Sequence, residues 1–171
     1  MRNGLRVVLL VVALLATVGV VAAKDRARFF AEADAAQEVA VPVMVDARAE
    51  AEAVFRLSED GETLEYKLKI KRLNPVTQAH IHLAPPGVNG PIVVDLAIFA
   101  PLDSPTGNAK NTIVVHGTIT AAQLRAGTPV SGPSLGPLLD AMRAGNTYVN
   151  VHTIVNRPGE VRGQIVEHAG H

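Results

Sequence analysis

Short runs of alternating apolar and polar residues dominate this chain, and they restrict it to a β-rich fold. Between residues 50 and 71, two such runs flank the turn sequence Ser-Glu-Asp-Gly-Glu, with apolar side chains at every second position and mostly charged ones between them. A strand points successive side chains to opposite faces, so this spacing places one face on a core and the other in water. The segment is therefore predicted to be a β-hairpin with strands over 50–57 and 64–71.

Further candidate strands follow along the rest of the chain. Five more candidate strands, each bounded by Gly, Pro, Asn or Asp, cover residues 76–83, 91–99, 112–119, 147–155 and 160–167. Helix start and stop signals predict two short helices, over 120–127 and 134–144. The second helix should pack its apolar face on the sheet through Leu138, Leu139 and Met142. The predicted fold class is all-β: an antiparallel β-sandwich, immunoglobulin-like or superoxide-dismutase-like, with seven or eight strands.

The first residues of the chain predict export. Two arginines precede an uncharged, mostly apolar run over 7–21, and Ala22 and Ala23 follow before charge returns at Lys24. This order is typical of a cleaved signal peptide, here over 1–23. The apolar run is also shorter than the ~20 residues that a membrane-spanning helix needs. We therefore expect a secreted or periplasmic protein without a stable membrane anchor.

Charge, cysteine content and length limit the possible partners, the possible metal ligands and the number of domains. The chain carries 16 basic and 16 acidic residues, so it lacks the positive surface that nucleic acids or anionic membranes attract. It contains no cysteine, which rules out disulfides and thiolate ligands. Beyond the signal peptide, the length suits one domain. We expect a flexible lead-in over 24–36, a folded domain over 37–167 and a tail over 168–171.

Several sequence blocks resemble one known family. In order they are AQEV from residue 36, LSEDGETLEYKLKI from 57, AHIHLAPPGVNGPIVVDL from 79, GTITAAQL from 117, GNTYVNVHT from 145 and GEVRGQI from 159. This order and spacing are similar to the CHRD domain, the module named after chordin, in its exported single-domain bacterial form. The resemblance spans about 37–166. It implies an extracellular or periplasmic binding module, with a protein or matrix partner that the family does not name.

His80 and His82 are the residues that most suggest chemistry. Residues i and i+2 of a strand project from one face about 7 Å apart, so two imidazoles can converge on one metal ion. His152 is a polar residue in a mostly apolar strand, and we expect it to be the third ligand. Imidazole suits copper and zinc, and Cu(II) should bind more tightly than Zn(II). The alternative is a structural cluster of hydrogen-bonded imidazoles that pins the turn after His82 to the sheet.

Other polar residues receive structural interpretations. The sequence GPSLG around Ser134 matches a hydrolase nucleophile motif, but that motif requires a preceding strand and a parallel sheet. We expect Ser134 to cap a helix instead. Glu160 and Arg162 lie on one face of the last strand, where the alternatives are a recognition edge and an exposed ion pair that closes the NRPG turn, and we expect the ion pair. His168 and His171 belong to the tail, where specific ligation is not expected. No catalytic residue is predicted.

Overall fold

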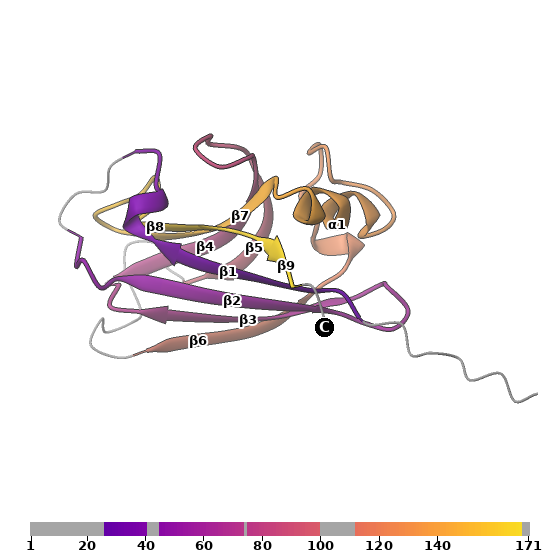
Figure 1. Cartoon of the computed structure of the whole chain (residues 1–171), viewed down its shortest axis with the longest axis horizontal. Coiled ribbons are helices and arrows are strands. Elements are labelled where there is room, and N and C mark those ends of the chain that lie inside the picture. Colours follow the sequence, from indigo (N-terminus) through magenta and orange to yellow (C-terminus); the bar gives the residue numbers. More distant parts are fainter. Residues whose placement is uncertain (1–25, 41–44, 74, 100–111, 169–171) are drawn as a thin grey trace, which may run out of the picture.

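A computed structural model describes residues 26–40, 45–73, 75–99 and 112–168 (Figure 1). Within these residues the strands are β1 (Arg28–Asp34), β2 (Glu50–Leu57), β3 (Leu64–Lys71), β4 (Val76–Leu83), β5 (Ile92–Ile98), β6 (Ile113–Ile119), β7 (Thr147–Thr153), β8 (Val161–Gln164) and β9 (Val166–Glu167). The helical elements are η1 (Ala35–Gln37), η2 (Ala121–Gln123) and α1 (Gly136–Arg143). The expected signal peptide over 1–23 lies outside the described residues. None of the described helices has the length and apolar character needed to cross a membrane.

All described strand pairs are antiparallel, and they join into one sheet. The strand order is β5-β4-β7-β8-β1-β2-β3-β6, with β9 paired to β1. The sheet curls until its edge strands β5 and β6 contact each other, so its shape is nearly that of a barrel (Figure 1). The all-β antiparallel class is therefore confirmed. The division into two sheets that a sandwich requires stays a prediction.

Most predicted elements are present, with bounds that differ by one or two residues. The last predicted strand is divided into β8 and β9, with Ile165 between them. Thr120 forms the expected capping box with Gln123, but the helix that follows is a single 3₁₀ turn. Helix α1 begins at Gly136 rather than Ser134, which is exposed and only accepts a hydrogen bond from the Gly136 N–H. The packing prediction for α1 is confirmed, because Leu138, Leu139 and Met142 are all buried.

The prediction of a flexible lead-in over 24–36 is wrong for its central part. Residues 28–34 form β1, which pairs along its whole length with β2 and also with β8 and β9. Its odd positions, Phe29, Ala31 and Ala33, are buried, and its even positions are exposed. The folded domain therefore begins before residue 37.

The alternation in β1 is hard to recognise in the sequence because its inward side chains are mostly small. Ala31 lies opposite Ala53 of β2, and Ala33 lies opposite Ala51. A segment rich in Ala and charge is depleted of the β-branched and aromatic residues that mark a strand. At this part of the curled sheet, neighbouring chains also approach closely. A side chain at Gly163 of β8 would clash with the Glu32 carbonyl of β1.

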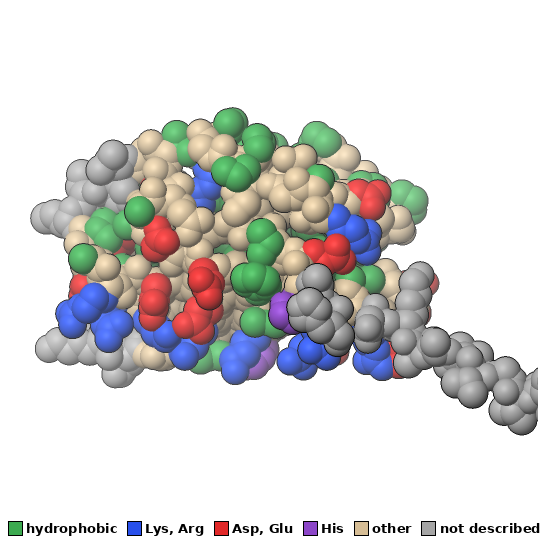
Figure 2. All heavy atoms as spheres, viewed as in Figure 1, with side chains coloured by type: hydrophobic (Ala, Val, Ile, Leu, Met, Phe, Trp, Pro, Cys, Tyr) green, Lys and Arg blue, Asp and Glu red, His purple; other side chains and the backbone are tan. Residues whose placement is uncertain are grey.

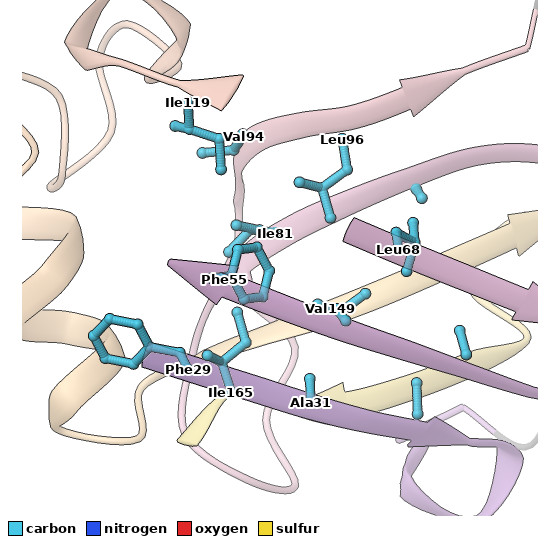
Figure 3. Packing of buried hydrophobic residues seen from close by; sticks show 14 of the residues in the cluster. Phe29, Ala31, Phe55, Leu68, Ile81, Val94, Leu96, Ile119, Val149 and Ile165 are labelled. Carbon is cyan, nitrogen blue, oxygen red and sulfur yellow. The ribbon is translucent and has the colours of Figure 1, made fainter. Parts of the chain in front are cut away.

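The hydrophobic core lies inside the curl of the sheet. Figure 3 shows Phe29 and Phe55 from one part of the sheet beside Ile81, Val149 and Ile165 from the other. Ile81 is fully buried in this core. Because side chains alternate along β4, the two histidines that flank Ile81 lie on the outer face of the sheet.

Candidate metal centre

The pairing of β4 with β7 brings the three predicted histidines together. Gln78 pairs with His152, His80 with Asn150, and His82 with Tyr148. All of these side chains therefore share the outer face of two adjacent strands. One potential ligand nitrogen from each histidine lies within 4.8 Å of the other two. The His80 Nδ1 and His152 Nε2 atoms are 3.1 Å apart.

Although the cluster lies on the outer face, it is covered by loops. His80, His82 and His152 are only 2%, 9% and 7% exposed. The loop after β4 returns over the strand, and the Gly90 carbonyl lies 2.9 Å from His82 Nδ1. A Cβ at Gly90 would lie 1.9 Å from the Leu83 carbonyl oxygen, so glycine is required for this close approach. The loop after β7 covers the other side, with the Arg157 carbonyl 2.8 Å from His152 Nδ1.

These carbonyls fix the tautomers of two histidines. A carbonyl oxygen can only accept, so Nδ1 of both His82 and His152 must carry the proton. The Nε2 atom of each ring then keeps its lone pair, and His152 Nε2 lies 3.1 Å from His80 Nδ1. His82 Nε2 is buried and has no hydrogen-bond partner among the described residues.

His80 has two neighbours that compete for its single N–H. Its Nε2 atom is 3.4 Å from the Asp95 carboxylate, and its Nδ1 atom faces the lone pair of His152 Nε2. A neutral imidazole carries one N–H, so it can donate to only one of them. Asp95 belongs to the neighbouring strand β5 and is held by Arg125, whose Nη2 atom is 2.7 Å from the same carboxylate oxygen.

The electrostatic environment keeps the imidazoles neutral. Burial is the largest cause in each case: it lowers the pKa of His80 to about 3 and that of His82 to about 4, and it also lowers the pKa of His152. The other imidazoles and the Arg125 charge lower the pKa of His80 further, while Asp95 opposes this. At neutral pH the cluster therefore consists of three uncharged nitrogen donors.

A stack of side chains holds His82 in place. Its ring is stacked on Tyr148 at a centroid distance of 4.9 Å and an interplanar angle of 15°. The Arg162 guanidinium carbon lies 3.6 Å from the Tyr148 ring centroid. Arg162 also donates to the Pro85 carbonyl at 3.0 Å, which ties it to the covering loop. This places a buried positive charge close to the histidines.

The predicted exposed ion pair between Glu160 and Arg162 is wrong. Both side chains are buried, at 5% and 1% exposure. Glu160 accepts hydrogen bonds from Thr153 and Asn156, whereas Arg162 donates to the loop after β4. The two residues take separate roles because the loops over the outer face supply each with other partners.

Glu38 is a half-buried carboxylate on this side of the sheet. Its carboxylate accepts a hydrogen bond from Asn150 Nδ2 at 2.7 Å. Burial raises the pKa of Glu38 to about 7, although the Asn150 hydrogen bond and the Arg162 charge oppose this. The Asn150 Oδ1 atom is buried without a hydrogen-bond partner in the described part of the chain.

Sequence reasoning found the three histidines and missed their supporting residues. Asp95, Arg125, Tyr148 and Arg162 come from strands and loops whose neighbours cannot be read from local patterns. Asp95 did carry one signal, because it is a lone carboxylate in the apolar run of β5.

Comparison with protein families matches residues 29–165 to the CHRD domain. The chain belongs to the CHRD family. The matched range begins inside β1, so the CHRD domain includes the strand that the sequence pattern did not reveal. It also includes all three histidines and the residues that contact them. Comparisons with curated proteins and with solved structures found no match.

Proposed function

We propose that this CHRD domain binds a transition-metal ion through His80 Nδ1, His82 Nε2 and His152 Nε2. The observation that carries the proposal is what surrounds the other nitrogen of each ring. Those three atoms face oxygen acceptors, namely the Asp95 carboxylate and the Gly90 and Arg157 carbonyls. If each of these three nitrogens donates a hydrogen bond, the other nitrogen of each ring keeps a lone pair, and one ligand nitrogen from each ring lies within 4.8 Å of the other two. A bound cation would satisfy all three.

This arrangement is typical of metal-binding histidines. Such a histidine donates its other N–H to a carboxylate or carbonyl, which fixes the ring and increases its basicity. Ligands about 2.1 Å from one tetrahedral ion lie about 3.4 Å apart. The 3.1 Å separation of the His80 and His152 nitrogens suits this distance, and the His82 nitrogen, within 4.8 Å of both, would have to approach them.

The structural alternative accounts less well for the same contacts. If His80 Nδ1 donates to His152, the lone pair of His80 Nε2 faces the Asp95 carboxylate. His82 Nε2 would also remain buried without a partner, which costs about 1–3 kcal/mol. A metal ion would remove both problems. Among divalent ions, we expect Cu(II) to bind more tightly than Zn(II).

The test is calorimetric titration of the metal-free chain from Lys24 with Cu(II) and with Zn(II). His168→Ala and His171→Ala are included throughout to remove the tail imidazoles while keeping β9. We expect one bound ion per chain, and loss of binding in His82→Ala and in His152→Ala. His116→Ala is the matched control, because His116 is an exposed histidine on β6 and should not contribute. Absence of saturable binding of Cu(II) and Zn(II) at micromolar metal together with no Cu(I) binding under argon, or equal binding by folded His82→Ala, would reject the proposal.

We further propose that the protein is exported, as the pattern of residues 1–23 indicates. Mass spectrometry of the protein from the periplasmic or extracellular fraction should find a chain that begins at Lys24. Recovery of the full-length chain with the cells would contradict export.

A binding module for an extracellular protein or matrix partner is the second candidate function. It is favoured by Val88, which is 50% exposed at the tip of the loop over the histidines. The chain has no cysteine, so Val88→Cys can carry a photo-crosslinker as the unique thiol. A specific adduct with an extracellular component, absent from Thr118→Cys on the opposite region of the sheet, would support this function. No adduct, or the same adduct from both, would reject it.

A further inference from the structure

We propose that this site prefers cuprous copper, Cu(I), to Cu(II) and Zn(II). The inference rests on the proposed function and specifies which ion the site holds. Three independent features of the site lead to it: the charge of its ligands, the charge of its surroundings and the number of ligands that it provides.

The ligands themselves supply no negative charge. All three are imidazoles, which bind a metal ion in their neutral form, and they are at least nine-tenths buried. The electrostatic cost of moving an ion from water into a low-dielectric site rises with the square of its charge. A divalent ion therefore loses far more hydration energy here than a monovalent ion. Sites that favour divalent ions in buried positions usually compensate with carboxylate or thiolate ligands.

The surroundings of the cluster add positive rather than negative charge. The Arg162 guanidinium lies against Tyr148, which is stacked on His82. Asp95, the carboxylate 3.4 Å from His80, is offset by Arg125 at 2.7 Å, and Glu38 faces Asn150 rather than a histidine. The Arg162 charge repels a doubly charged ion about twice as strongly as a singly charged one.

The number of ligands also suits Cu(I). In the described part of the chain, the group close enough to share an ion contains three histidines and no carboxylate. Three nitrogen donors complete a trigonal site for Cu(I), whereas Cu(II) favours tetragonal geometry and Zn(II) favours four ligands. A small hollow is lined by Gln78, Arg157 and His152, so it borders one of the three proposed ligands.

The test compares the affinities of the chain for the two oxidation states of copper. Cu(I) is measured under argon by competition with bicinchoninate, and Cu(II) by competition with nitrilotriacetate. We expect the dissociation constant for Cu(I) to be at least about 100-fold lower. By the thermodynamic cycle, that ratio raises the reduction potential of the bound copper by about 120 mV over the free ion. Spectroelectrochemistry provides this second readout.

Gln78→Glu tests the electrostatic explanation directly. Gln78 pairs with His152 across the strands, and the substitution adds a carboxylate of almost the same shape beside the cluster. It should reduce the preference for Cu(I) by at least about tenfold, mainly through tighter Cu(II) binding. Lys67→Gln changes the net charge equally on the exposed face of β3 and should leave the preference unchanged.

The outcomes separate this inference from the proposed function. If Cu(II) binds as tightly as Cu(I) and both are lost in His82→Ala, the function holds and the cuprous preference is wrong. If neither ion binds in a histidine-dependent way, both proposals fail. Equal shifts in Gln78→Glu and Lys67→Gln would also overturn the inference, because the preference would then not depend on local charge.

Discussion

Two outer surfaces of the same sheet have polar side chains in an alternating pattern, but they differ in what covers them. Over β1, β2 and β3, acidic and basic side chains lie in water, as Figure 2 shows. Over β4 and β7, the equivalent positions hold His80, His82, Asn150 and His152, and all are buried beneath loops. Both surfaces read as polar in the sequence. Only one of them is exposed to solvent.

This difference shows where chemistry can be concentrated. Exposed polar groups have water as a partner, so their pairings contribute little to stability. Buried polar groups must find partners within the protein, and an unpaired one is costly. On the covered face, one nitrogen of each histidine ring faces an oxygen atom. If these three nitrogens carry the hydrogens, the other three are left with lone pairs and no hydrogen-bond donor between them. This lack of donors is what distinguishes a candidate metal site from a structural cluster.

Removal of β1, the strand that connects the two surfaces, should have the largest effect on stability. A chain that begins at Ala36 lacks the strand between β8 and β2, and it loses the buried Phe29. We expect it to be unfolded at 25 °C, or to melt more than about 10 °C below the chain that begins at Lys24. Circular dichroism melting of both chains is the measurement. Equal melting temperatures would mean that the two surfaces hold together without β1.

Substitution of the two adjacent phenylalanines should give the next largest difference. Phe29 is 0% exposed on the core side of β1, whereas Phe30 is 38% exposed on the solvent side. Phe29→Ala should lower the free energy of unfolding by about 3–5 kcal/mol through the cavity that it leaves. Phe30→Ala serves as the matched control, and we expect a loss below about 1 kcal/mol. Similar losses in urea denaturation would contradict the assignment of the two faces.

A smaller effect should appear in the pH dependence of stability, and it should arise from the buried histidines of the covered surface. The unfolded chain takes up protons on its histidines below pH 6.5, whereas the folded chain holds the pKa of His80 at about 3 and that of His82 at about 4. Between pH 6.5 and these folded pKa values, the unfolded state therefore binds more protons than the folded state. Stability accordingly falls as the pH is lowered from 6.5. Each such histidine contributes about 1.4 kcal/mol per pH unit.

Glu38 acts in the opposite direction. Its folded pKa of about 7 lies above the ordinary 4.5, so the folded chain retains a proton that the unfolded chain has lost, and this stabilisation disappears as the pH rises toward 7. The histidines outnumber it, so metal-free protein should become more stable from pH 5 to 6.5. Urea denaturation at several pH values measures the slope. It should steepen in Glu38→Gln and flatten in His80→Asn, and a flat profile in the unsubstituted chain would rule out neutral buried histidines.

The smallest effect is expected on the exposed surface. Lys69 and Glu52 form a pair at 4.0 Å, with both side chains more than one-third exposed. Lys69→Gln should change the free energy of unfolding by less than about 1 kcal/mol, and added salt should reduce even that difference. The comparison is made by urea denaturation at low and high salt. A larger loss would mean that exposed charges on this sheet matter as much as buried ones.

Part of the candidate site could be predicted from the sequence. The shared face of His80 and His82 follows from their spacing in one strand, because strand geometry is local. The participation of His152, 72 residues from His80, depends on the β4–β7 register, which the local pattern does not contain. The supporting contacts of Asp95, Gly90 and Arg157 could not be predicted, because they depend on strand order and on how two loops fold back.

The sequence by itself determined an antiparallel β-rich fold, the positions of most strands and the core face of helix α1, since apolar periodicity is a property of neighbouring residues. It did not reveal β1, whose inward alanines carry too weak a hydrophobic signal. Only the tertiary structure decided which polar face is buried and which nitrogen of each imidazole holds the proton. The physical reason is that burial and hydrogen bonding are set by groups distant in the chain, and local pattern contains no information about them.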